Sequence, residues 1–95
     1  MSNLVLTRKA GQSVRLMIGS EPTILSVVEV QGGCCYLAID VGNEQKVRFR
    51  GEMQIAEGVT VTVLDLAKGH AKLGFDAPRD VHILRTELIK EKESD

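Results

Sequence analysis

Apolar and polar positions alternate in short runs along most of the chain. Runs such as "LVLTRK" (4–9) and "VRLMIG" (14–19) are rich in β-branched and aliphatic residues. Each run stops at a turn signal, for example Gln31-Gly32-Gly33. Period-two alternation closed by glycine is typical of β-strands. The predicted strands cover residues 4–9, 14–19, 23–30, 34–40, 46–50, 53–58, 59–66, 71–76 and 81–85.

Only the C-terminal segment, "TELIKEKESD" (86–95), has helical character. Thr86 is a suitable N-cap, and Leu88 and Ile89 can pack while the charged residues face water. With 95 residues, the whole chain is expected to form a single domain, 1–95.

Two stretches of the chain match each other at a separation of 36 residues. "SVVEVQGGCCYLAID" (26–40) lies over "TVLDLAKGHAKLGFD" (62–76), with four identities and several conservative pairs. With one loop residue dropped, "RFRGEM" (48–53) falls on "ILRTEL" (83–88), and Arg50 then matches Arg85. We interpret this match as an internal repeat of about 14–53 and 54–88. The general similarity of antiparallel hairpins remains the alternative.

Two such strand units can cover each other's apolar faces, whereas one cannot. The sequence therefore predicts a mainly β protein, a two-lobed antiparallel β-sandwich or barrel of duplicated strands with a short C-terminal helix. A chain of this kind is a dimer built into one polypeptide. A monomeric pseudodimer is the preferred prediction, and a homodimer of an unduplicated fold stays open.

Composition narrows the function classes. Twelve basic and thirteen acidic side chains give a net charge of −1, which excludes a polybasic coat. A local basic patch is still allowed, because screening over about 8–10 Å lets one surface act alone. The chain has no 18-residue apolar run and no signal pattern, so we expect no membrane association and a cytoplasmic location. Adjacent Cys34 and Cys35 fit a reducing compartment, with one thiol expected inside and one outside.

No pattern of catalytic or metal-binding residues stands out. His70 and His82 have no cysteine or carboxylate at metal-ligand spacing, and no nucleophile–base pair or phosphate-binding glycine loop occurs. We therefore expect no enzyme activity, no catalytic residue, no metal and no cofactor. With Tyr36, Phe49 and Phe75 as the only aromatic residues, RNA binding by aromatic stacking alone is not expected.

Two segments carry a resemblance to a known family. "LVLTRKAGQSVRLMIG" resembles the start, and "EGVTVTVLDLAKGHAKLGFDAPRDVHILRTEL" (57–88) resembles the remainder, of the carbon storage regulator (CsrA/RsmA) family of bacterial RNA-binding proteins. Residues 20–56 look like a diverged second set of the middle strands. The resemblance implies an intertwined dimer of five-stranded chains with two RNA sites at opposite edges. Each site would hold a GGA-containing single-stranded loop of an mRNA leader hairpin, and binding would change translation or message stability.

The resemblance implies one complete RNA site here, because the chain has one LTRK strand and one final "APRD…R" strand. The site residues it implies are Thr7, Arg8, Lys9, Ala77, Pro78, Arg79, His82, Ile83, Leu84 and Arg85. The run "KVRFRGEM" would fuse the last strand of one unit to the start of the next. The opposite edge, around Arg48 and Arg50, would then be a degenerate half-site. A regulatory small RNA or a protein antagonist is the further partner that the resemblance implies.

The chemistry of these residue types suits the role. A β edge can read exposed RNA bases through main-chain groups, and arginine forks can grip phosphate or guanine. Other readings stay open: Arg8 and Lys9 as a solubilising edge, Arg79-Asp80 as turn polarity, and Leu6 and Ile83 as core residues. The alternative function is a protein-interaction module that has lost RNA binding, which the acidic residues of the tail favour.

Overall fold

The computed structural model describes residues 2–78 and 81–85, and within them the chain is built from β-strands. The strands are β1 (Ser2–Lys9), β2 (Ser13–Ile18), β3 (Glu21–Gln31), β4 (Cys34–Ile39), β5 (Glu44–Arg48), β6 (Glu52–Ala56), β7 (Val59–Ala67), β8 (His70–Ala77) and β9 (His82–Arg85). The mainly β prediction is confirmed. The helix expected at 86–95 lies outside the described residues. Within the described part of the chain, no helix has the length and apolar character that crossing a membrane requires.

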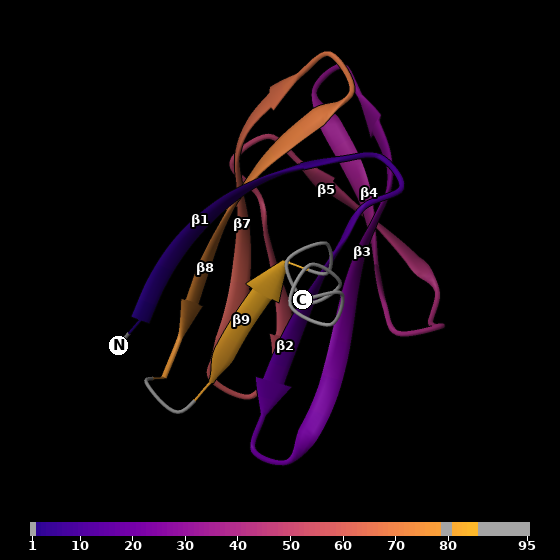
Figure 1. The fold of residues 1–95 in the computed structure, drawn as a ribbon. Helices are drawn as coiled ribbons and strands as arrows, with labels where there is room; N and C mark the ends of the chain where they lie inside the picture. Colours follow the sequence, from indigo (N-terminus) through magenta and orange to yellow (C-terminus); the bar gives the residue numbers. More distant parts are fainter. Residues whose placement is uncertain (1, 79–80, 86–95) are drawn as a thin grey trace, which may run out of the picture.

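The strands form two antiparallel sheets that pack face to face (Figure 1). One sheet has the order β1-β8-β7-β6, and the other has the order β5-β4-β3-β2-β9. Alternation along each strand points every second side chain between the sheets. Phe75, Leu73 and Val61 from the first sheet meet Leu16, Leu25 and Leu37 from the second in one buried core. The apolar period of the sequence therefore sets the core.

The same backbone contacts occur at two places in the molecule. Val27 and Val63 each lie directly before a one-residue β-bulge, in β3 and β7. A turn is bound to each of these valines. Gly11 N–H donates to Val27 O and Val27 N–H donates to Gln12 O, while Arg50 N–H donates to Val63 O and Val63 N–H donates to Gly51 O. The fold thus has two sets of strands, β1–β4 and β5–β8, with matching local geometry.

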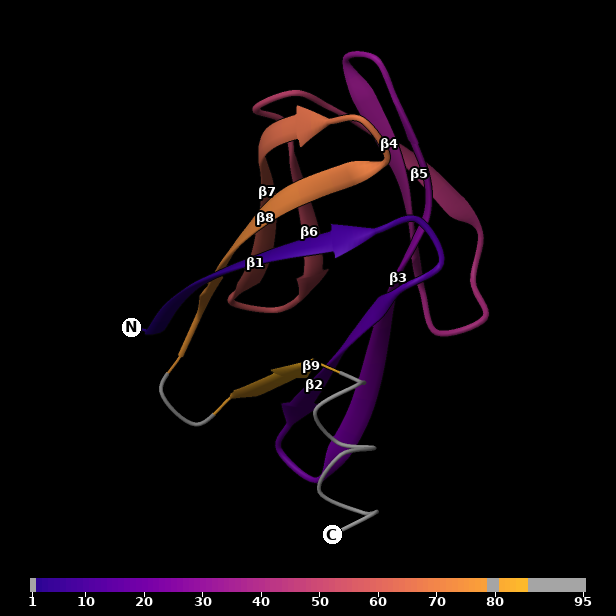
Figure 2. The same cartoon turned by 45° about the horizontal axis from the view of Figure 1, so that its top comes forward.

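The two sets exchange their first strands (Figure 2). β1 pairs with β8 of the second set, and β5 pairs with β4 of the first set. Lys9 stands opposite His70, and Arg48 stands opposite Cys34. Ala10 N–H donates to Gly69 O in one set, as Phe49 N–H donates to Gly33 O in the other. The sheets are therefore bound together by the chain's own strand exchange.

These pairings correct the interpretation of "KVRFRGEM". The sequence match aligned residues 48–53 with 83–88, which made this run the counterpart of the final strand. The structure places β5 against β4 in the way that β1 lies against β8, so β5 is the counterpart of β1. Arg48 is equivalent to Lys9, and Arg50 is equivalent to Gly11, not to Arg85. A short basic strand followed by a turn allowed either alignment, and only the partner strand decides between them.

The second set has no counterpart of β9 among the described residues. β9 pairs with β2 at the edge of the five-stranded sheet, and β6, which is the equivalent of β2, is an open edge. The sheets consequently have unequal strand numbers, and the two sides of the sandwich differ. One side carries the edges β1 and β9, and the other carries β5 and β6.

Both cysteines are buried and not disulfide-bonded, so the prediction of one outward thiol is wrong. Cys35 points into the core. Cys34 is the first residue of β4, and its Sγ is 3.8 Å from Gln31 Oε1. Burial raises the pKa of the Cys35 thiol from 9.0 to about 11, and the neighbouring Cys34 adds to the shift.

Candidate nucleic-acid interface

The outward face of β1 carries the first group of predicted site residues. Leu6 and Arg8 point toward the core, so alternation places Thr7 and Lys9 on the outer face, and both are exposed. Val5 lies on the same face with half of its surface exposed. The sequence-predicted residues Thr7 and Lys9 are thus accessible to a ligand.

The main chain of β1 is also available along its open edge. Ala10 N–H donates to Gly69 O, so alternate residues of β1 face β8 while the others face away. Lys9 belongs to the residues that face away: its N–H donates to Gln12 Oε1, and its carbonyl accepts from Gln12 N–H. By the same alternation, the main-chain groups of Val5 and Thr7 point out of the sheet. On this edge the Thr7 carbonyl accepts from Arg8 Nε. A sheet edge with no neighbouring strand can bind another strand or the edges of exposed bases.

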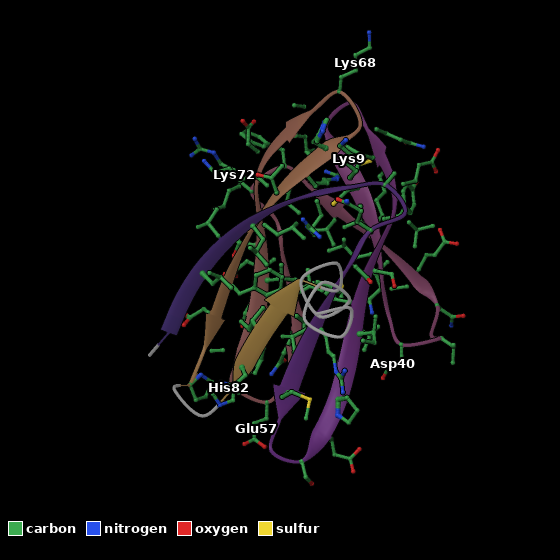
Figure 3. The ribbon with its side chains drawn as sticks, viewed as in Figure 1. Lys9, Asp40, Glu57, Lys68, Lys72 and His82 are labelled. Carbon is green, nitrogen blue, oxygen red and sulfur yellow. The ribbon has the colours of Figure 1, made fainter. Side chains whose placement is uncertain are left out.

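β8 adds positive charge that the sequence prediction missed. Lys72 is opposite Thr7, and it is exposed. His70 is opposite Lys9, and its Nδ1 is 2.8 Å from Lys68 O. Lys9 and Lys72 lie at the same end of the β1–β8 pair, while the Lys68 side chain projects from the hairpin tip (Figure 3). Only the strand register reveals Lys72, because it is 65 residues away from Thr7 in the sequence.

A shallow hollow adjoins this surface. Gly74 borders a cavity of about 230 Å³ on the outer face, and the Leu64 side chain lies over Gly74 itself. Val5 from β1 and Leu64 from β7 line its rim. The hollow offers an apolar surface beside the β1 edge, where the flat face of a base could rest. No motif in the sequence pointed to it.

Arg8 differs from its neighbours because it is buried. Only 5% of its surface is exposed, and its Nε donates to Thr7 O over 2.9 Å. The equivalent position in the second set is Val47, which is also buried. A guanidinium held in this way supports the β1 edge and offers little surface to a ligand. Direct contact of Arg8 with RNA stays a prediction that its burial does not favour.

β9 supplies the second group of predicted residues. It pairs with β2, with His82 opposite Met17 and Arg85 opposite Val14. His82 is exposed, and Ile83 is half-buried against the core, as its reading as a core residue expects. For Leu84 and Arg85, the structure describes the backbone alone. Since Val14 closely follows the turn after Lys9, the end of β9 lies near the end of β1.

The loop before β9 contributes less than expected. Ala77 is fully buried in the core, so its side chain is not accessible to a ligand and its prediction as a contact residue has no support from its position. Pro78 is exposed and lies against Gly58, and its carbonyl accepts from Val81 N–H over 3.1 Å. Arg79 lies outside the described residues. The loop thus anchors β9 through Pro78 and Val81.

These elements define one surface, which we call the β1–β9 surface. It consists of Val5, Thr7, Lys9, Lys72 and the backbone of β9. The two strands are edges of different sheets, and no ladder joins them within the described residues. Both strands border the same side of the sandwich (Figures 1 and 2). The turn after β1 leads into β2, which pairs with β9. β8, which pairs with β1, is followed in the chain by β9.

The predicted half-site lies on the other side. Lys46 and Arg48 are exposed on β5, and Arg50 is exposed in the turn that follows. The Arg50 guanidinium carbon is 5.3 Å from the centroid of the Phe49 ring, and the Phe49 side chain is 46% exposed.

Among the described residues, no three His, Cys, Asp or Glu side chains gather as metal ligands do.

Comparison with known proteins gives one family. Residues 48–94 match the CsrA global regulator protein family. Several proteins named Translational regulator CsrA are similar to the chain. The protein from Clostridium novyi is 39% identical over 49 residues, which cover 50% of this chain and 68% of that protein.

The other two relatives are matched over a smaller share of their own length. The Campylobacter jejuni protein is 43% identical over 37 residues, or 39% of this chain and 49% of that protein. The Thermotoga petrophila protein is 44% identical over 48 residues, or 50% of this chain and 58% of that protein. The chain therefore spans about half the length of several curated relatives that it matches. No solved structure matches it.

Proposed function

This chain belongs to the CsrA family of global regulators, and from that premise we propose that it regulates translation by binding single-stranded RNA on the β1–β9 surface. The observation that carries the proposal is the open edge of β1. Main-chain groups of Val5 and Thr7 point out of the sheet next to the Lys9 and Lys72 ammonium groups. Main-chain groups can read base edges while the cations hold phosphate.

The ligand we propose is a GGA-containing loop of an mRNA leader hairpin, as the family resemblance implies. The hollow lined by Val5 and Leu64 would receive a base face, and β9 would close the surface from the other sheet. Arg8 would hold Thr7 in place through its bond to the Thr7 carbonyl. The protein would act by occupying the message, without catalysis.

A titration with a fluorescent GGA hairpin tests this function, with a hairpin whose loop carries CCA as the control. We expect tighter binding to the GGA loop and a log–log salt slope of about −0.7 for each phosphate neutralised. Lys9→Ala combined with Lys72→Ala should weaken binding by roughly tenfold and flatten the slope by about 1.4. Lys68→Ala removes the same charge from the hairpin tip and should change affinity less than twofold.

Arg85→Ala tests the contribution of β9. A lost charge-assisted hydrogen bond would cost roughly 1.5–3 kcal/mol of binding free energy. Equal affinity for the GGA and CCA loops would reject sequence-specific reading. Absence of RNA binding together with capture of a protein partner would favour the protein-interaction alternative.

A further inference from the structure

The edge formed by β5 and its following turn has the same construction as the β1 edge. Phe49 N–H donates to Gly33 O, so Lys46 and Arg48 are the residues of β5 whose main-chain groups face away from β4. The Arg48 carbonyl accepts from Gly51 N–H, as the Lys9 carbonyl accepts from Gln12 N–H. β5 is the outermost described strand of the five-stranded sheet, so in the described part of the chain this edge is open as well.

The side chains on this edge differ in kind from those of β1. Lys46 stands where β1 has Thr7, and Arg48 stands where β1 has Lys9. Alternation spaces them about 7 Å apart on one exposed face. The basic run has three cations, Lys46, Arg48 and Arg50. Glu44 and Glu52 lie on either side of it in the sequence and limit the positive patch to these three residues. A patch of this size can hold about two phosphates of an extended strand.

The turn provides a second, independent observation. Arg50 has a positive φ of 66°, and its equivalent in the first set is Gly11, with a φ of 92°. A side chain is disfavoured in this conformation, which glycine adopts readily. The Arg50 N–H is bound to Val63 O over 2.7 Å, so the turn has little freedom to relax. An arginine at a strained, fixed position indicates a use for its side chain.

The neighbouring residue Phe49 indicates what the Arg50 side chain is used for. Its ring is 46% exposed, and the Arg50 guanidinium lies 5.3 Å from the ring centroid. At the equivalent position the first set has Ala10, which has no such surface. An exposed ring with an adjacent guanidinium is a stacking platform for nucleobases, and stacking does not depend on base identity.

We propose that Lys46, Arg48, Phe49 and Arg50 form a second contact surface for single-stranded RNA, which we call the β5 platform. It takes phosphates on Lys46 and Arg48 and stacks a base on Phe49 and Arg50. The strand that would correspond to β9 is absent beside β6 in the described chain, so the β5 platform lacks the second wall of the β1–β9 surface. It therefore binds RNA without preference for GGA and lies on the opposite side of the sandwich.

Titration with a fluorescent single-stranded 12-mer of uridine tests the β5 platform separately from the GGA site. The wild-type protein should bind it with salt-sensitive affinity. Phe49→Ala combined with Arg50→Gly installs the residues that the first set has at equivalent positions, so the backbone geometry is already accommodated by the fold. This double variant should bind the uridine 12-mer about tenfold more weakly. Its affinity for the GGA hairpin should change less than twofold.

The outcomes separate the two proposals. The Lys9→Ala, Lys72→Ala protein should lose hairpin affinity and keep most of its affinity for the 12-mer. Unchanged 12-mer binding by the Phe49→Ala, Arg50→Gly protein, with unfolding as cooperative as in the wild type, would overturn the β5 platform. So would failure of the wild-type protein to bind the 12-mer. Loss of GGA preference with the 12-mer result intact would instead overturn the function proposed for the β1–β9 surface.

Discussion

Arg50 shows how one side chain can work against the stability of a turn. The left-handed conformation costs a non-glycine residue roughly 1–2 kcal/mol, and Arg50 occupies it at φ 66°. Arg50→Gly removes this strain but loosens the unfolded chain, so we expect a net gain of about 0.5–1 kcal/mol in the free energy of unfolding. Urea denaturation measures it. A loss of more than 1 kcal/mol would mean that the arginine stabilises the turn through contacts with Phe49 that outweigh the strain.

Gly74 and Leu64 form a pair whose sizes compensate each other. A Cβ at Gly74 would lie 2.8 Å from Leu64 Cδ1, and the equivalent positions of the first set carry Ala38 and Val28. Gly74→Ala should therefore lower the free energy of unfolding by about 1 kcal/mol, because Leu64 must leave its rotamer. Adding Leu64→Val should recover most of the loss. A double-mutant cycle with no coupling would show that the two side chains do not constrain each other.

The buried Cys35 thiol makes the free energy of unfolding depend on pH in the alkaline range. Its pKa is raised from 9.0 to about 11 by burial, so the folded protein holds this proton after the unfolded chain has released it. The stabilisation is complete below pH 9 and is lost as the pH rises toward 11. Ala71 has the place in β8 that Cys35 has in β4. Cys35→Ala therefore installs a residue that the fold already accepts there, and it should reduce this alkaline loss. Equal slopes of unfolding free energy against pH in both proteins would contradict the assignment.

The β1 strand carries the proposed reading function in its backbone, and proline can test that directly. Thr7→Pro removes an N–H that points out of the sheet, so the ladder to β8 keeps its hydrogen bonds. We expect affinity for the GGA hairpin to fall by tenfold or more while the free energy of unfolding changes by about 1 kcal/mol or less. Anisotropy titration and urea denaturation give the two values. Leu6→Pro is the contrasting variant, since it breaks the ladder and should unfold the protein.

A Thr7→Pro protein that binds the hairpin with wild-type affinity would remove the main-chain group from the mechanism. The side chains of Lys9 and Lys72 would then carry RNA binding alone, and the preference for GGA would need another source.

Strands were predictable from the sequence because alternation and glycine turns are local. Residues 71–76, for example, were predicted as a strand and lie within β8. Strand partners were not local. The run 46–50 was correctly recognised as basic and largely extended, yet its alignment with the last strand was wrong, because pairing with β4 depends on where the rest of the chain goes. The same limit hid Lys72, which joins the candidate site only through the register between β1 and β8.

The sequence predicts the burial of apolar side chains well, but the burial of charged side chains is ambiguous. Alternation placed Leu6 inside, and it is 5% exposed. The same alternation places Arg8 inside, but its charge and the family resemblance favoured an exposed contact residue. A long guanidinium that can satisfy its hydrogen bonds on neighbouring carbonyls is able to remain in a core-facing position, as the Arg8 bond to Thr7 O shows.

Strand exchange within one polypeptide determines how the protein should associate. β1 and β5 each cross to the other set, so contacts that an intertwined dimer makes between chains are made here inside one chain. We therefore expect native mass spectrometry to show a 10.4 kDa species. Saturating GGA hairpin should add one RNA to each chain, because within residues 2–78 and 81–85 only one side of the sandwich combines a β1-type edge with a β9 wall.

Because the two sides of the sandwich differ, the number of hairpins bound per chain tests whether only one side reads GGA. A species of twice the mass that binds two hairpins would keep the ratio at one hairpin per chain, as expected if two complete chains associate. Binding of more than one hairpin per chain would contradict the prediction, because a second surface would then have to read GGA. Under the single-chain arrangement, competition with the uridine 12-mer should leave the bound hairpin in place at low protein concentration, because the β5 platform and the β1–β9 surface lie on opposite sides of the sandwich.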